Sequence, residues 1–172
     1  LLGLLAAKMA LEDCGYGSGR DFDRDRTSVI IGVTGTQELV IPLSSRLGYP
    51  RWRKALEDSG IAPAKTEEII QKISDSYIPW QENSFPGLLG NVVAGRISNR
   101  LDLRGTNCVV DAACASSFSA IHLAALELIS GRSDMVVTGG VDTLNDIFMH
   151  MCFSKTHTLS ATGDARPFSK DA

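Results

Sequence analysis

Long apolar stretches are missing from this sequence of 172 residues. No apolar run reaches the roughly 18 residues that a membrane-spanning helix needs, so no association with a membrane is expected. An excess of positive charge is missing as well, because 17 lysine and arginine residues stand against 20 aspartate and glutamate residues, for a net charge of -3. Proteins that grip phosphate backbones are usually basic. Nucleic acid is therefore not an expected partner.

Cysteine is scarce, and its spacing matches no common site. The four cysteines are Cys14, Cys108, Cys114 and Cys152, and none of them forms a Cys-x-x-Cys pair. This spacing fits neither a zinc site nor a secreted disulfide framework, so we expect no bound metal. Free thiols in a reducing cytoplasm fit best. Cys14, Cys108 and Cys152 are expected to pack in or near the core.

The sequence does contain an alternation of strand-like and helix-like segments. The β-branched run 27–33 is typical of a strand buried on both faces. Further strands are predicted over 106–111 and 135–138, and helices over 1–13, 51–59, 64–76, 85–99, 115–129 and 145–152. This order predicts an α/β layered fold with a mainly parallel sheet. The glycine-containing turn 35–37 lacks a phosphate-loop pattern, so no nucleotide cofactor is expected.

Cys114 stands where the strand-like run 106–111 meets the helix-like stretch 115–129. A side chain at such a junction faces the N-terminus of the helix, where free N–H groups and a partial positive charge favour a nucleophilic thiolate. The same N–H groups could hold the oxyanion that forms when a thioester is attacked. Position alone allows another interpretation, a buried cysteine that packs as a small hydrophobic residue. Ser116 and Ser117 are expected to form local hydrogen bonds in the first helical turn.

A basic partner for Cys114 is not evident from spacing. His122 lies eight residues further along the same predicted helix, which is about 12 Å along its axis and too far for proton transfer. His150 and His157 have no spacing that ties them to Cys114. Asp111 stands just before the predicted helix, and we expect it to cap the helix and not to act as a base.

The segment around Cys114, Asp111-Ala112-Ala113-Cys114-Ala115-Ser116-Ser117, resembles the active-site signature of the β-ketoacyl synthases, the condensing enzymes of fatty-acid and polyketide assembly. The likeness continues over 91–105, 134–142 and 159–168. Two further segments, 142–146 and 151–156, are most similar to the ketosynthase of polyunsaturated-fatty-acid synthases, which are multidomain, polyketide-synthase-like enzymes.

This resemblance implies a thiolase-like layered fold, of which residues 1–172 would supply most of the N-terminal half. The chain would then be a partial ketosynthase domain, truncated at both ends. The resemblance places the nucleophile at Cys114 and puts Phe153 in the acyl pocket, with ordinary core packing as the alternative for Phe153. The family's triad is Cys-His-His, and no histidine of this chain matches its two histidine motifs. The piece on its own is therefore expected to be inactive.

The implied reaction is an acyl transfer followed by a decarboxylative Claisen condensation. Cys114 would accept an acyl chain from a phosphopantetheine thioester on an acyl carrier protein, and a malonyl thioester would then extend that chain by two carbons. The backbone N–H of Cys114 would be one oxyanion donor. No cofactor would bind directly. The resemblance also implies a homodimer paired through the strand before Cys114, so an isolated piece is expected to be unstable or self-associated.

Three alternatives compete with a carrier-protein-dependent condensing enzyme. Relatives that use coenzyme A, such as thiolases and chalcone-synthase-like enzymes, match the signature less well. A non-catalytic chain-length or scaffold subunit shares the fold, but known examples replace the cysteine that this chain keeps at Cys114. A cysteine-dependent redox or hydrolase domain would need a resolving cysteine, and Cys108 would lie about 20 Å away along an extended strand, too far for a disulfide.

Overall fold

The computed structural model describes residues 1–17, 20–34, 44–143 and 147–170. The chain divides into two compact units, Leu1–Val141 and Asp142–Ala172. Across the described ranges, no helix combines the length and the apolar character needed to cross a membrane.

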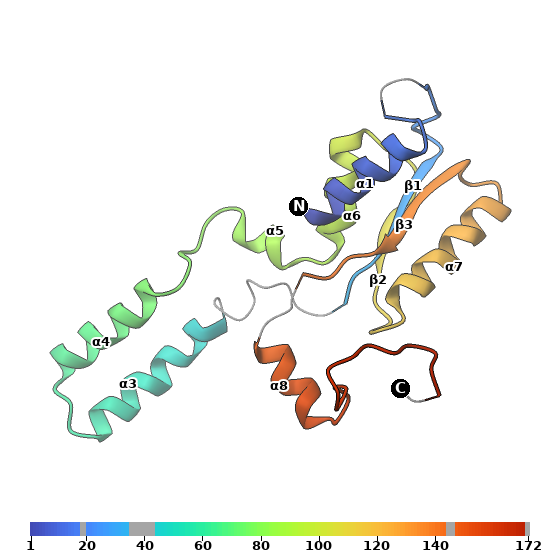
Figure 1. Cartoon of the computed structure of the whole chain (residues 1–172). Coiled ribbons are helices and arrows are strands. Elements are labelled where there is room, and N and C mark those ends of the chain that lie inside the picture. Colours follow the sequence, from blue (N-terminus) through green and yellow to red (C-terminus); the bar gives the residue numbers. More distant parts are fainter. Residues whose placement is uncertain (18–19, 35–43, 144–146, 171–172) are drawn as a thin grey trace. The chain divides into compact units, whose positions relative to one another are not determined.

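A parallel sheet forms the centre of the first unit (Figure 1). Its strands stand in the order β2-β1-β3 and are β1 (Thr27–Gly32), β2 (Asn107–Val110) and β3 (Met135–Gly140). Both pairings of β1 are parallel, and Val29 lies opposite Asn107 on one side and Val137 on the other. Every residue of β1 is buried. The prediction of a parallel sheet around a strand buried on both faces is confirmed.

Helices cover both faces of this sheet (Figure 1). One face is covered by α1 (Leu2–Asp13) and α6 (Asn91–Leu101), and the other by α7 (Ser116–Ile129). The main cluster of buried side chains joins α1 and α6 to the sheet, and its members are Ala7, Val29, Ile31, Ala94, Ile97 and Leu103. Each fully buried Val or Ile side chain stabilises the fold by ~1.5–3 kcal/mol. The layered α/β architecture therefore has its core where the sequence placed the β-branched run.

A helical hairpin follows in the same unit. It consists of the 3-10 turn η1 (Arg46–Gly48), α3 (Tyr49–Asp58) and α4 (Pro63–Asp75). Arg53 of α3 forms a salt bridge with Glu67 of α4. Both helices have proline in their first two positions, where the missing N–H costs nothing. The two helices predicted over 51–59 and 64–76 are thus confirmed.

The single helix predicted over 85–99 is wrong, because two helices occupy this range. α5 (Ser84–Leu88) ends at Leu89, which is extended with φ -95° and ψ 114°, and α6 begins anew after Gly90. Gly87 and Gly90 each cost about 1 kcal/mol in a helix relative to alanine. Two such residues close together explain why the helix breaks here.

The second unit contains α8 (Ile147–Lys155), followed by residues with neither helix nor strand as far as 170. The helix predicted over 145–152 is confirmed from Ile147 and continues to Lys155, whereas residues 145 and 146 lie outside the described residues. None of the unit's described residues is buried. Local hydrogen bonds within it include those from the hydroxyls of Thr156 and Thr158 to the carbonyl of Phe153, both 3.1 Å.

Candidate active site

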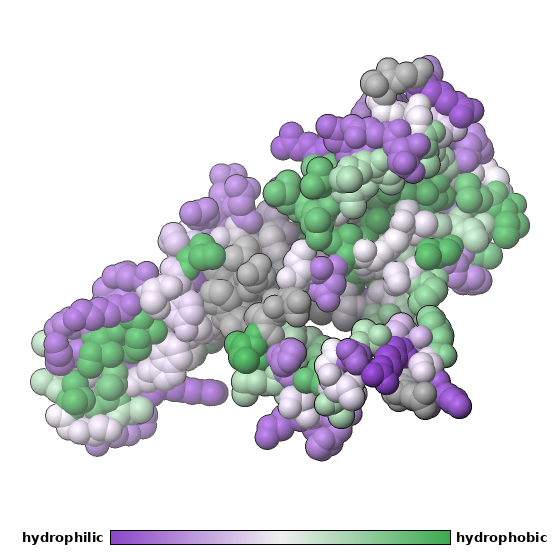
Figure 2. Space-filling view, in the orientation of Figure 1, coloured by the Kyte–Doolittle hydropathy of each residue, from purple (hydrophilic) through white to green (hydrophobic). Residues whose placement is uncertain are grey.

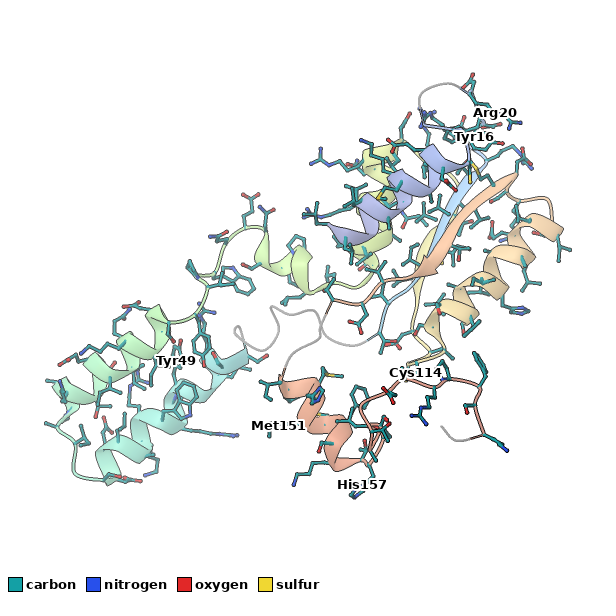
Figure 3. The ribbon with its side chains drawn as sticks, in the orientation of Figure 1. Tyr16, Arg20, Tyr49, Cys114, Met151 and His157 are labelled. Carbon is teal, nitrogen blue, oxygen red and sulfur yellow. The ribbon has the colours of Figure 1, made fainter. Side chains whose placement is uncertain are left out.

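Cys114 lies in the turn that connects β2 to α7 (Figure 3). β2 ends at Val110 and α7 begins at Ser116, within one residue of the predicted boundaries. The thiol is exposed, so the interpretation as a buried packing residue does not hold. A cysteine in this turn has solvent on one side and the first turn of a helix on the other.

The turn around Cys114 is tight and contains a strained residue. Ala113 has φ 49°, a left-handed conformation that costs a residue with a Cβ roughly 1–2 kcal/mol. The N–H of Ala115 donates to the carbonyl of Ala112, and that of Ser116 to the carbonyl of Ala113, both at 3.0 Å. The backbone therefore reverses sharply and presents Cys114 at its tip.

Two hydroxyl groups hold this turn in place. Ser116 is buried; its Oγ donates to the carbonyl of Ala113 at 2.6 Å and accepts from the N–H of Ala112 at 2.9 Å. Thr34, two residues after β1, places its Oγ1 2.6 Å from that Oγ. The same Thr34 hydroxyl lies 2.9 Å from Oδ1 of Asp111 and 3.0 Å from the carbonyl of Ala113. The turn around Ala113 is thus held by one hydroxyl from α7 and one from the residues after β1.

Asp111 does not cap α7, so that prediction is wrong. Its Oδ1 accepts from the N–H of Ala113, two residues along, at 3.0 Å, which is the local bond of an Asx-turn. The residue at the N-cap of α7 is Ala115, without a side-chain cap. The tight turn places four residues between Asp111 and the first residue of the helix, so the carboxylate bonds the turn and not the helix.

The first turn of α7 rests directly on the sheet backbone. A Cβ added to Gly32, the last residue of β1, would lie 2.5 Å from the carbonyl carbon of Ser116. A Cβ on Gly140, the last residue of β3, would lie 2.8 Å from the Cβ of Ser117. Sequence reasoning missed both glycines, although a glycine at the end of a β-branched run can mark a close approach of backbones. Ser116 forms the predicted local hydrogen bonds, whereas Ser117 packs against Gly140.

The four cysteines occupy different environments. Cys108 of β2 is half-buried, and burial, followed by the nearby carboxylate of Glu127, raises the pKa of its thiol. Cys14 and Cys152 are exposed, so the prediction that they pack in or near the core is wrong. Cys14 follows the last residue of α1, and Cys152 lies on α8, whose described residues include none that is buried. Among the four, only Cys114 combines exposure with a tight turn before a helix.

The histidines and Phe153 are not assembled around Cys114 by the first unit. His122 lies on the exposed side of α7, and within the described part of the chain its ring has no hydrogen bond. His150, His157 and Phe153 belong to the second unit. Phe153 is 40% exposed on α8, which does not fit ordinary core packing, and its place in an acyl pocket stays a prediction.

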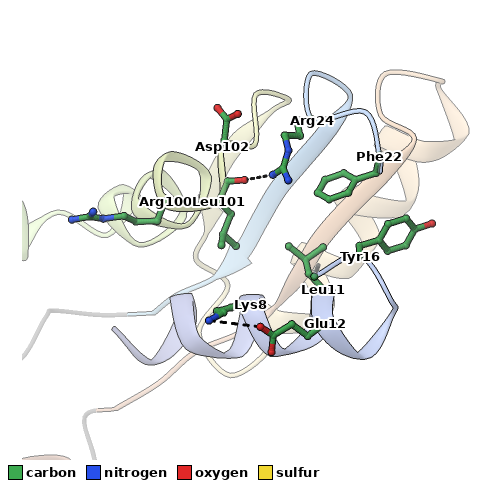
Figure 4. Close-up of a pocket in the computed structure, with 10 residues that line it drawn as sticks. Lys8, Leu11, Glu12, Tyr16, Phe22, Arg24, Arg100, Leu101 and Asp102 are labelled. Atoms are coloured by element: carbon green, nitrogen blue, oxygen red, sulfur yellow. Dashed lines mark hydrogen bonds and ion pairs between the residues drawn. The ribbon is translucent and has the colours of Figure 1, made fainter. Parts of the chain in front are cut away.

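No metal site is formed by the histidine, cysteine and acidic residues that the structure describes. The turn 35–37 lies outside the described residues. A cavity of about 470 Å³ opens between α1 and the end of α6 (Figure 4). Charged residues that line it are bonded to other parts of the fold. The guanidinium of Arg24 donates to the carbonyl of Leu101 at 2.6 Å, and Lys8 pairs with Glu12. Cys114 does not line this cavity.

Comparison with known sequences places the chain among condensing enzymes. The family model of the β-ketoacyl synthase N-terminal domain matches residues 1–172. A polyunsaturated fatty acid synthase from Thraustochytrium sp. is 38% identical over 169 residues, which are 98% of this chain and 6% of that protein. A probable polyketide synthase from Dictyostelium discoideum is 35% identical over 130 residues, 69% of this chain and 5% of the relative. The chain thus spans a small part of these proteins.

Solved ketosynthases have the same fold. A β-ketoacyl synthase from Burkholderia phymatum superposes with a TM-score of 0.64 at 21% identity, covering 97% of this chain and 36% of that one. The oxazolomycin ketosynthase domain from Streptomyces albus superposes with a TM-score of 0.60 at 22% identity, over 98% of this chain and 24% of that one. The thiolase-like layered fold is confirmed by these likenesses.

Proposed function

Because the chain belongs to the β-ketoacyl synthase family, we propose that Cys114 is the acyl-accepting nucleophile of a decarboxylative Claisen condensation. The observation that supports this most directly is the exposed thiol of Cys114 on a strained turn before α7. A nucleophile on a turn of this kind is accessible to an incoming thioester and lies beside the positive end of a helix dipole.

In the first step the Cys114 thiolate attacks the carbonyl carbon of an acyl thioester. A new carbon–sulfur bond forms at Sγ, the bond to the donor's sulfur breaks, and the phosphopantetheine group of the donor leaves as a thiolate. The N–H groups of Ala115 and Ser116 already bond carbonyls within the turn, so we assign the oxyanion to the backbone N–H of Cys114. The negative charge of the oxyanion is therefore held by one N–H group and not by all the free N–H groups of the first helical turn.

In the second step a malonyl thioester loses carbon dioxide, and the electron pair of the broken carbon–carbon bond forms a carbanion. That carbanion attacks the acyl group on Cys114, the bond to Sγ breaks, and a β-ketoacyl product two carbons longer departs. We assign assistance in decarboxylation to the family's two histidines, which none of His122, His150 and His157 matches by sequence motif.

The substrates and partners follow from this reaction. We propose that an acyl carrier protein delivers both the acyl and the malonyl thioester on phosphopantetheine, in the cytoplasm, with no cofactor bound to this chain. Phe153, an exposed aromatic residue on α8, is proposed to line the path of the acyl chain. Likeness to a polyunsaturated fatty acid synthase favours a place in fatty-acid assembly.

We further propose that the domain dimerises through β2. In the order β2-β1-β3 this strand is at the edge of the sheet formed by the described residues, and an edge strand is a template for pairing with a second copy. Apolar side chains on α7 are exposed as well, among them Phe118 at 70% and Ile129 at 82% (Figure 2). Sedimentation of residues 1–172 should show self-association, and a monodisperse, cooperatively melting monomer would contradict it.

The acylation test uses intact-protein mass spectrometry on the full natural protein that contains residues 1–172, incubated with an acyl-pantetheine thioester. One acyl group should be gained and mapped to the peptide with Cys114, and Cys114→Ala should abolish the gain. Cys152→Ala is the matched control, because it removes another exposed thiol and should leave the gain intact. A folded dimer that gains no acyl mass would instead indicate a non-catalytic scaffold protein.

A further inference from the structure

We propose that Thr34 and Ser116 are positioning residues for Cys114, and that their hydroxyl groups set the geometry in which the thioester is attacked. This inference rests on the proposed function of Cys114 as the acyl acceptor. It assigns to two hydroxyl side chains a role that neither the signature around Cys114 nor the spacing of the histidines indicates.

The hydrogen bonds of Ser116 converge on the two residues that precede Cys114. The carbonyl of Ala113 receives both the N–H of Ser116, at 3.0 Å, and its Oγ–H, at 2.6 Å. The N–H of Ala112 donates to the same Oγ at 2.9 Å. One buried hydroxyl therefore binds the N–H of the peptide between Asp111 and Ala112 and the carbonyl of the peptide between Ala113 and Cys114, since a hydroxyl can donate once and accept twice.

Thr34 joins this turn to the core strand of the sheet. It follows β1 by two residues, and β1 is buried along its whole length. Its Oγ1 lies 2.6 Å from Oγ of Ser116 and 2.9 Å from Oδ1 of Asp111. These contacts connect residues 77 and 82 positions apart in the sequence. The hydroxyl of Thr34 thereby connects the turn to the end of a strand that is buried along its whole length.

Both reactive groups of Cys114 depend on the conformation of Ala113. The backbone N–H of Cys114 belongs to the peptide bond that follows Ala113, and the direction of the thiol follows from the same peptide plane. Attack needs the sulfur about 3–3.5 Å from the carbonyl carbon, with the oxyanion donor about 2.7–3.1 Å from the oxygen. A backbone that relaxes from φ 49° moves both groups together, and a displacement of about 1 Å can slow a reaction ~100-fold.

Two reactions of the same thiol separate positioning from folding. Acylation by an acyl-pantetheine thioester needs both the sulfur and the oxyanion donor, whereas alkylation by iodoacetamide forms no oxyanion and needs only an accessible thiolate. The rates of both are measured at Cys114 by peptide mass spectrometry in the full natural protein. Loss of positioning should lower the acylation rate and leave the alkylation rate nearly unchanged.

The variants are chosen as matched pairs. Thr34→Val removes the hydroxyl and keeps the shape, and we expect acylation to slow at least about tenfold while alkylation changes less than about twofold. Thr34→Ser restores the hydroxyl and should return acylation to within about twofold of the original rate. Ser116→Ala should act as Thr34→Val does. Ser119→Ala, on the same helix, removes a hydroxyl that has no hydrogen bond to the described residues and should change neither rate.

Three results would overturn the inference. Thr34→Val could acylate as fast as the unaltered protein, which would show that the hydroxyl is dispensable. Acylation and alkylation could fall together without rescue by Thr34→Ser, which would show a role in folding only. If the unaltered protein takes up no acyl group at Cys114, the proposed function fails and the positioning role falls with it. If Ser116→Ala does not fold, the comparison of Thr34→Val with Thr34→Ser still tests the inference, because Thr34 is exposed and its substitution is expected to leave the fold intact.

Discussion

The two compact units of the chain differ in what holds their residues in place. In the first unit β1 is covered on both faces, and Val29 and Ile30 are 0% and 2% exposed. In the second unit none of the described residues is buried, and Phe148 and Met151 of α8 are 51% and 59% exposed. The first unit has a buried apolar core, and the described residues of the second unit contribute none.

The two residues predicted to form the site, Cys114 and Phe153, therefore differ in how much buried structure supports them. Cys114 lies on a turn in which the next residue but one, Ser116, rests on the buried strand β1, so the core of the first unit supports its backbone. Phe153 lies on α8, a helix of nine residues, and an isolated helix of this length is marginal in water. The nucleophile is thus supported by a buried core, whereas the described residues of the second unit provide no buried core to hold Phe153.

The largest effect should come from a matched pair of isoleucines. Ile30→Ala removes a side chain that is 2% exposed and should lower the free energy of unfolding by ~2–5 kcal/mol, since a cavity remains in the core. Ile147→Ala removes one that is 74% exposed and should cost less than about 0.5 kcal/mol. Urea unfolding of the natural protein measures both, followed by hydrogen exchange in peptides from β1 for Ile30→Ala and from α8 for Ile147→Ala. Equal losses in the free energy of unfolding would contradict the view that only the first unit depends on a buried core.

A smaller loss of stability is expected when Gly32 of the first unit is changed to alanine than for Ile30→Ala, and Gly163 of the second unit is the control. Gly32→Ala forces the added Cβ against the backbone of Ser116, and such overpacking costs typically ~1–3 kcal/mol. Because the displaced backbone belongs to the turn at Cys114, acylation should slow as well. Gly163→Ala meets only open space at φ +80°, so it strains a single residue of the second unit.

The same urea experiment tests this pair. Gly163→Ala should leave the unfolding of β1 unchanged, because residue 163 belongs to a unit whose described residues share no buried core. A Gly32→Ala variant with unaltered stability and an unaltered acylation rate would show that the turn does not depend on the close approach of α7 to the sheet.

Much of the first unit could be predicted from its sequence because its signals are regular. The β-branched run 27–33 predicted β1 and its burial, and the position of Cys114 between a strand and a helix was found within one residue. These features depend on periodicity and on residue type, which a single sequence displays. The family resemblance around Cys114 added the reaction, which periodicity alone could not supply.

The details of the turn could not be predicted, because they depend on contacts between residues far apart in the sequence. Thr34 and Ser116 are 82 positions apart, and nothing in the local sequence of either indicates the other. Asp111 was predicted to cap the helix for a different reason: α7 begins one residue later than predicted, and the carboxylate bonds the N–H of Ala113 within the turn. The role of Gly32 likewise becomes visible only when α7 lies against the sheet.

The smallest effect should come from ion pairs on the surface. Arg26, before β1, donates to both carboxylate oxygens of Asp134, before β3, at 2.8 and 2.7 Å. This hydrogen bonding, together with the charge of Arg26, lowers the pKa of Asp134. Arg166 and Asp164 of the second unit are also paired, at 2.8 Å, but they are two residues apart and connect no separate elements.

The lowered pKa of Asp134 fixes the sign of its pH dependence. Its contribution is present above the unfolded value of about 3.9 and is lost as the pH falls through the lower value of the folded state. Asp134→Asn should therefore make the stability of the first unit fall less steeply below about pH 4, and Arg26→Gln should do the same. The effect should be modest and should shrink in high salt, because the pair is exposed. Asp164→Asn should leave the unfolding of β1 unchanged at every pH, and an equal response to both asparagine substitutions would show that the two units unfold as one.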